Sequence, residues 1–330
     1  MSAVRNFILT MLISLLIFGF LAYGIMVFAS DAFSLGAAKP SDNNEDNAET
    51  SKPDDQKPPE DFVSIKGESF TALFIGTDYR PDVYDDYEYT DKEIDGFPAP
   101  LREIETDTII LVRVNKESGE CIFCSIPTNA EILIDGLPST LNKLYARQGI
   151  GALVQQVTIL TGLPIDYYGI TTIGSLAYII DQFGGIEFYV PEDIEYIDEG
   201  TNQSINIPKG SRLLDGKTAA DMLRYNSYKD GDVTRRRVNV DFLKALISKA
   251  MSETAMKDAV SAYIKYSSKI ETNLTIKDLT DNAELIFSYS KMTVKEYTYP
   301  GKTTGTDKDA KFVASVEEAL KFFNKYKFKG

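Results

Sequence analysis

Hydrophobic and polar residues follow two different periods from about residue 64 to the end of the chain. Short apolar runs predict strands at 70–75, 108–114, 120–126, 186–190 and 293–299. Apolar residues at helical spacing predict helices at 150–160, 173–183, 217–224, 234–252 and 315–326. Strands and helices mixed in this way are typical of an α/β fold that has a central sheet with helices on both faces.

An apolar run near the start of the chain predicts a membrane-spanning helix. Residues 7–29 hold no charged side chain, and as a helix they would extend over about 35 Å, enough to cross a hydrocarbon core of about 30 Å. A cleavable signal peptide is the alternative, but its apolar region usually has only about 7–15 residues. Arg5 before the run and Asp31 after it predict a single-pass protein of the plasma membrane, with a cytoplasmic stub at 1–6 and the C-terminal part outside.

The segment between this run and the first predicted strand has a different composition. Residues 30–63 are acidic, contain several prolines and are poor in aromatic and β-branched side chains. Such a segment cannot bury enough apolar surface to fold. We therefore expect an acidic disordered tether at 30–63 and an extracellular folded domain at 64–330.

Composition excludes several classes of function. The 330 residues include no histidine, which excludes Ser-His-Asp and Cys-His catalytic groups and histidine-ligated metals. A bound metal would therefore have oxygen ligands, which favours Mg²⁺, Mn²⁺ or Ca²⁺. The net charge of −14 argues against nucleic-acid binding.

The two cysteines, Cys121 and Cys124, lie in one predicted strand. Residues three apart in a strand are about 10 Å apart and face opposite sides, whereas a disulfide needs Cα atoms within about 7 Å. We expect two small core residues rather than a redox pair.

Two acidic residues stand at the ends of predicted strands. Asp78 follows the strand at 70–75, and Asp107 directly precedes the strand at 108–114. Two converging carboxylates could hold a divalent cation, or each could close a turn. The acidic segment 79–106 between them is typical of a solvated surface loop, and its role stays open.

Arginines gather in one short segment of this acidic chain, at Arg224, Arg235, Arg236 and Arg237. The guanidinium group suits phosphate because it donates two parallel hydrogen bonds. Asp232 precedes these arginines near the predicted start of a helix, and helix N-termini bind anions. Ion pairs with the surplus acidic residues are the alternative.

Six motifs in order give the chain a family resemblance. They are GTDYR after the first strand, TDT, SIP, DQFGGIE, GSRLLDGKTAADMLR and DVTR. In order and spacing, from about residue 66 to 328, the chain resembles the LytR–CpsA–Psr (LCP) family. The resemblance implies an αβα sandwich with a central mixed sheet. It also implies a transferase that moves a glycopolymer from a polyprenyl pyrophosphate carrier to peptidoglycan during cell-envelope assembly.

The resemblance also implies roles for individual residues. Asp78 and Asp107 would hold Mg²⁺ and, with Arg235, act in catalysis. The pyrophosphate and its surroundings would be bound by further residues, which are Arg80, Arg224, Asp232, Arg235 and Arg237.

The chain departs from the family pattern at several cationic positions. Where the family has arginine, this chain has Glu105, Thr128, Asn226 and Val238. Arg236 or Arg237 could take the place of one missing cation. The sequence thus leaves open an active transferase with a rearranged anion site, a non-catalytic LCP-like protein that binds a polyprenyl carrier or an envelope partner, and a purely structural envelope protein.

Overall fold

The computed structural model describes residues 69–77, 105–198, 202–251, 270–275, 278, 288–305 and 310–326. The chain divides into two units, 1–55 and 56–330, and every described residue belongs to the second. The predicted stub, membrane span and tether lie outside the described residues, as do Asp78, Arg80 and most of the loop 79–106. Within the described ranges, no helix is both long and apolar enough to cross a membrane.

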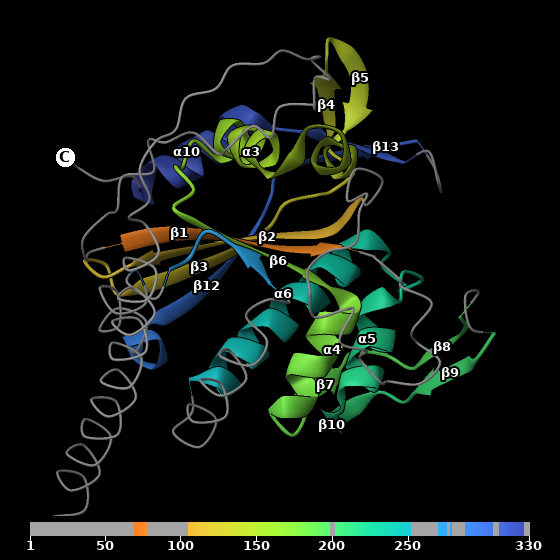
Figure 1. Ribbon diagram of the computed structural model, residues 1–330. Helices are drawn as coiled ribbons and strands as arrows, with labels where there is room; N and C mark the ends of the chain where they lie inside the picture. Colours follow the sequence, from red (N-terminus) through yellow and green to blue (C-terminus); the bar gives the residue numbers. More distant parts are fainter. Residues whose placement is uncertain are drawn as a thin grey trace, which may run out of the picture. The chain divides into compact units, whose positions relative to one another are not determined.

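A six-stranded mixed sheet forms the centre of the fold, as the resemblance implies (Figure 1). Its strand order is β11-β6-β1-β2-β3-β12. The strands are β1 (Ser69–Thr77), β2 (Thr106–Asn115), β3 (Glu120–Ser125), β6 (Tyr167–Thr172), β11 (Glu271–Thr272) and β12 (Thr293–Thr298). β1 is parallel to β6 and β3 is parallel to β12, while β2 is antiparallel to both β1 and β3. Apolar runs become central strands here because both faces of the sheet are covered.

Helices cover both faces of this sheet. On one face, Leu73 and Ile109 join the cluster that packs against α3 (Leu141–Thr161) and α10 (Val316–Phe323). On the other face, Ile110 and its neighbours pack against α6 (Asp232–Ala250). Figure 1 shows these helices on opposite sides of the sheet. The alternation of side chains along each strand thus divides the core into an α3 side and an α6 side.

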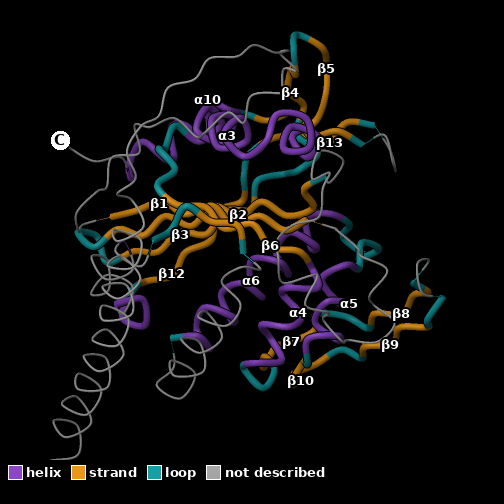
Figure 2. The backbone as a smooth tube through the Cα atoms, in the orientation of Figure 1, coloured by secondary structure: helices purple, strands orange, loops and turns teal. Residues whose placement is uncertain are grey.

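A third cluster forms beside the sheet around two further helices, α4 (Ile173–Gln182) and α5 (Gly216–Arg224). The strands around them pair as β7 (Ile186–Val190) with β10 (Gly210–Leu214), and as β8 (Ile194–Ile197) with β9 (Ser204–Ile207) (Figure 2). A Cβ atom at Gly216 would lie 2.1 Å from the carbonyl oxygen of Ala177. This close approach requires glycine at the start of α5.

The remaining described elements are short. Two hairpins pair β4 (Glu131–Ile134) with β5 (Leu137–Thr140), and β13 (Gly301–Thr304) with β14 (Lys311–Ala314). Short 3₁₀ turns occupy η4 (Ser288–Lys291) and η6 (Asn324–Tyr326).

The prediction for the two cysteines is confirmed. Cys121 packs on the α6 side of the sheet and Cys124 on the α3 side, and both are free thiols. Burial raises the pKa of Cys121 to about 12 and raises the pKa of Cys124 further. Neither thiol is therefore a nucleophile at neutral pH.

Candidate functional site

One edge of the central sheet brings together the ends of five strands. β1, β3, β6 and β12 end at this edge and β2 begins there, as their parallel and antiparallel pairings require. The first half of α6 lies against the same edge, where the Asn239 amide donates a hydrogen bond of 3.0 Å to Thr108 Oγ1. Loops at such an edge are where ligand sites of open α/β sheets form.

Asp107 lies at this edge in a β-bulge. The register pairs Gly76 with Thr108 and Thr77 with Thr106, so Asp107 is the extra residue of β2 at this point. Its side chain is exposed, whereas neighbouring Thr106 is only 1 % exposed. A bulge turns one side chain out of the regular alternation, and here that side chain is the predicted catalytic carboxylate.

Three buried polar atoms gather around the bulge without a hydrogen-bond partner in the described chain. They are Thr77 Oγ1, Thr106 Oγ1 and Asn239 Oδ1. Leaving such a group unsatisfied costs about 1–3 kcal/mol, so these atoms are candidates to bind a ligand at this edge. The sequence prediction missed all three, although the threonines flank the predicted aspartates in the motifs GTD and TDT.

The donor set at the bulge is suited to a hard cation. Carboxylate and hydroxyl oxygens suit Mg²⁺, which usually binds one or two protein carboxylates together with substrate phosphates. No group of three His, Cys, Asp or Glu side chains gathers anywhere in the described part of the chain. Mg²⁺ at this edge would therefore be held by Asp107, by oxygens such as those of Thr77 and Thr106, and by phosphate. Asp78, the other predicted ligand, lies outside the described residues.

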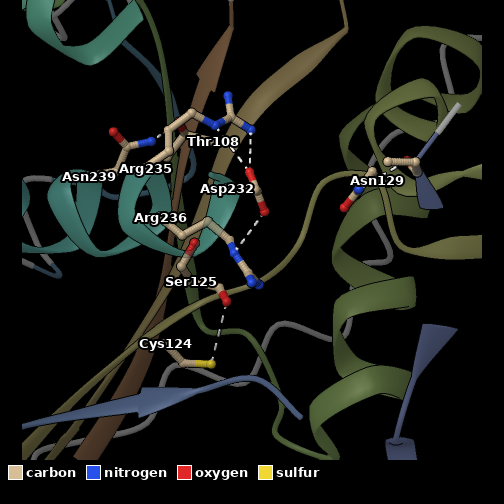
Figure 3. Close-up of polar contacts among 9 residues, drawn as sticks. Thr108, Cys124, Ser125, Asn129, Asp232, Arg235, Arg236 and Asn239 are labelled. Atoms are coloured by element: carbon tan, nitrogen blue, oxygen red, sulfur yellow. Dashed lines mark hydrogen bonds and ion pairs between the residues drawn. The ribbon is translucent and has the colours of Figure 1, made fainter. Parts of the chain in front are cut away.

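Asp232 holds two of the predicted arginine cluster together at the start of α6. Arg235 donates two hydrogen bonds to Asp232 Oδ1, 3.1 Å from Nε and 2.9 Å from Nη2. Arg236 Nε lies 3.0 Å from Asp232 Oδ2. Figure 3 shows the two guanidinium groups on either side of this carboxylate. An acidic residue in the first turn is also favoured by the helix dipole, and the supporting role of Asp232 in substrate binding stays a prediction.

Arg224 is bound elsewhere. Its guanidinium forms an ion pair with Asp198, and only 13 % of the Arg224 side chain and 2 % of the Asp198 side chain are exposed. Asp198 follows β8, in the region of the α4–α5 cluster. The ion-pair alternative from the sequence thus describes Arg224, and its role in phosphate binding stays a prediction.

Arg237 is exposed on α6 and forms no ion pair with any described residue. Its predicted role in substrate binding is untested, and Arg80 lies outside the described residues.

Where the resemblance implied arginine, the residues of this chain make other contacts. The backbone of Thr128 accepts a hydrogen bond of 2.7 Å from the Asn142 N–H at the start of α3. The side-chain amide of Asn142 donates to Glu105. Val238 is 3 % exposed and packs in the α4–α5 cluster. An arginine at position 238 would therefore have to enter a packed apolar core.

The chain is similar to bacterial proteins of cell-wall biosynthesis. The chain is 24 % identical over 277 residues to the polyisoprenyl-teichoic acid–peptidoglycan teichoic acid transferase TagV of Bacillus subtilis, a match that covers 79 % of this chain and 66 % of TagV. It is 28 % identical over 201 residues to LcpB of Corynebacterium glutamicum, a probable cell wall biosynthesis protein, covering 61 % of this chain and 46 % of LcpB. The chain thus spans less than two thirds of the length of these relatives.

Solved structures share the fold. The crystal structure of B. subtilis TagV superposes with a TM-score of 0.61 at 22 % identity, covering 79 % of this chain and 98 % of that one. TagT bound to LI-WTA superposes with a TM-score of 0.59 at 21 % identity, covering 78 % and 89 %. The sequence profile of the LytR_cpsA_psr family matches residues 37–328, so the chain belongs to the LytR_cpsA_psr (LCP) family.

Proposed function

We propose that this protein is a membrane-anchored transferase that moves a glycopolymer from a polyprenyl pyrophosphate carrier to peptidoglycan in cell-envelope assembly. Membership of the LCP family and the distant similarity to TagV support the reaction class. One observation carries the proposal to this chain. The exposed carboxylate of Asp107 and the Asp232–Arg235–Arg236 group belong to elements that meet at one sheet edge, next to polar atoms that have no hydrogen-bond partner in the described chain.

The residues at this edge would each have a separate role in a phosphoryl transfer. An acceptor hydroxyl oxygen bonds to the phosphorus that carries the glycopolymer, the bond from that phosphorus to the bridging oxygen breaks, polyprenyl phosphate leaves and the hydroxyl proton is released to water. Arg235 donates hydrogen bonds to the phosphate oxygens, which become more negative in the transition state. Asp232 orients Arg235 through its two hydrogen bonds. Mg²⁺, held by Asp107 and Asp78, would supply further neutralisation of that charge.

The predicted anchor suits a carrier that is itself a membrane lipid. A span at 7–29 and a tether at 30–63 would keep the folded domain on the outer surface of the plasma membrane, where peptidoglycan is the acceptor. A polyprenyl chain stays in the bilayer, so an anchored enzyme meets its substrate at high effective concentration.

Binding of the carrier tests the proposal. The full-length chain, solubilised in detergent, is titrated with a polyprenyl pyrophosphate in the presence and absence of Mg²⁺. We expect saturable binding that Mg²⁺ strengthens and that Asp107→Asn weakens at least about tenfold. Asp135→Asn, which changes an exposed carboxylate in the β4–β5 turn, is the matched control and should bind as the wild type does. Absence of binding to the wild-type chain would refute the proposal.

A non-catalytic carrier-binding protein is the second candidate, and the burial of Val238 favours it. The family has a cationic residue at this position, whereas in this chain Val238 is part of an apolar core cluster. Such a protein would bind the carrier and release no polyprenyl phosphate from it. Restoring arginine at position 238 cannot separate the two candidates, because a buried unpaired charge would destabilise the fold.

A further inference from the structure

Arg236 differs from the arginines on either side of it. Arg235 uses both Nε and Nη2 on one carboxylate oxygen, and Arg237 is exposed to solvent. Only 13 % of the Arg236 side chain is exposed, and its Nε lies 3.0 Å from Asp232 Oδ2 without hydrogen-bond geometry. Among the described residues, Asp232 is the ion-pair partner of this guanidinium, and Arg236 Nε donates no hydrogen bond. Arg236 is thus a largely buried guanidinium that has an ion-pair partner in Asp232, but its Nε has no hydrogen-bond acceptor among the described residues.

The guanidinium of Arg236 lies across the edge of the sheet. Its helix, α6, packs on one face of the sheet, whereas the Arg236 Cζ atom lies 5.4 Å from the ring centroid of Phe312, which belongs to the core on the α3 side. Figure 3 places Arg236 beside Ser125 and Cys124 at the end of β3. The Arg236 guanidinium therefore lies at the end of β3, and the segment that follows β3 contains Thr128 and Asn129.

The Phe312 ring, over which the Arg236 guanidinium lies, is fixed by its own neighbours. The Phe312 N–H donates a hydrogen bond of 3.0 Å to the carbonyl of Asn129, and the Asn129 side-chain amide donates one of 3.1 Å to the carbonyl of Ala310. A Cβ atom at Gly301 would lie 2.4 Å from the Phe312 ring, so glycine at that position makes room for it. A cation over an aromatic face is stabilised further when it is desolvated.

The charges around Asp232 favour binding of an anion. Arg235 and Arg236 share the single carboxylate of Asp232, so two positive charges face one negative charge. Burial lowers the pKa of Arg236 and the nearby Asp232 carboxylate opposes that shift, so the arginine stays charged. The two guanidinium groups lie at opposite oxygens of this carboxylate, Arg235 at Oδ1 and Arg236 at Oδ2, so each is close enough to its neighbour to bind one of two linked phosphates.

We propose that Arg236 binds the second phosphate of a pyrophosphate group whose first phosphate is bound by Arg235. Arg236 would thereby replace the cation that this chain lacks at position 128, supported by Phe312 and Asn129. The inference rests on the proposed function, because it concerns the pyrophosphate of the same carrier. It adds a specificity residue that the family motif does not mark.

The preference for pyrophosphate over phosphate tests this role. The affinities of inorganic pyrophosphate and inorganic phosphate are measured by calorimetry with Mg²⁺ present, for the full-length chain in detergent and for Arg236→Gln. The wild type should prefer pyrophosphate, and Arg236→Gln should lose about 10- to 100-fold of that preference while it binds inorganic phosphate nearly as before. Arg236→Lys, which keeps the charge but not the fork, should lie between them. Arg212→Gln, on exposed β10, is the matched control and should leave the preference unchanged.

Other results would overturn the assignment. A structural role for Arg236 predicts that both anions lose affinity together and that the ratio of the two affinities stays constant. An unchanged ratio in both Arg236 variants, or a wild type without preference for pyrophosphate, contradicts the proposal. This readout is independent of turnover, so Arg236 can be confirmed as a pyrophosphate ligand even if the protein transfers no glycopolymer.

Discussion

Asp107→Asn is expected to lower the rate of glycopolymer transfer by at least about a hundredfold, since a metal-holding carboxylate supplies several kcal/mol of transition-state stabilisation. Asp107 is the extra residue of a β-bulge and its side chain is exposed. The substitution therefore removes a charge from the edge of the sheet and leaves the core packing intact. Release of polyprenyl phosphate from a polyprenyl pyrophosphate-linked oligosaccharide measures the effect.

Two controls separate the loss of the Asp107 charge from other effects of the substitution. Circular dichroism of Asp107→Asn should match that of the wild type, which separates a lost charge from a lost fold. Asp135→Asn carries the same chemical change on an exposed turn and should retain full activity. A transfer rate for Asp107→Asn equal to that of the wild type would remove Asp107 from the site.

Asp198→Asn is expected to lower the free energy of unfolding by about 3–5 kcal/mol. The reason is the ion pair with Arg224, in which both side chains are largely buried. Removal of the carboxylate charge leaves a buried guanidinium without its counter-ion. Denaturant unfolding followed by circular dichroism measures the loss, because the chain has no tryptophan to report it by fluorescence.

An exposed ion pair provides the comparison. Glu317→Gln removes the partner of Lys321 on the surface of α10, where 86 % and 74 % of the two side chains are exposed, and it should leave stability nearly unchanged. A stability of Asp198→Asn that matches this control would show that Asp198 does not hold Arg224. Arg224 would then be a stronger candidate for phosphate binding.

Strands β1, β2 and β3 of the central sheet could be predicted from sequence because they are apolar on both faces, whereas β6 and β11 of the same sheet were not predicted. The runs at 70–75 and 108–114 became the cores of β1 and β2, each longer by one or two residues at either end. Helix α3 begins at Leu141, whereas the predicted helix began at 150. The prediction started late because Gly149, with φ of 76°, interrupts the regular helix and breaks the apolar pattern. The hairpin strands escaped prediction because four residues with mixed exposure carry too little periodicity.

The candidate site was predictable only in part, and the reason is tertiary structure. The position of Asp107 at the start of a strand follows from local pattern, but its place in a bulge depends on the register with β1. The partners of the arginines come from distant segments, Asp198 for Arg224 and Phe312 for Arg236. A motif therefore identified Arg224 as a ligand candidate, while the structure assigns it a buried counter-ion and draws attention to Arg236 instead.

Turnover of the carrier tests most directly whether this protein is a transferase. The full-length chain in detergent is mixed with Mg²⁺, a polyprenyl pyrophosphate-linked oligosaccharide and a peptidoglycan fragment, and both polyprenyl phosphate and glycosylated peptidoglycan are quantified. We expect the two products to form in equal amounts, only in the presence of Mg²⁺, and Asp107→Asn to lower the rate of formation of both by at least about a hundredfold. Binding of the carrier with neither product formed would contradict a transferase and leave this protein as a carrier-binding member of the LCP family.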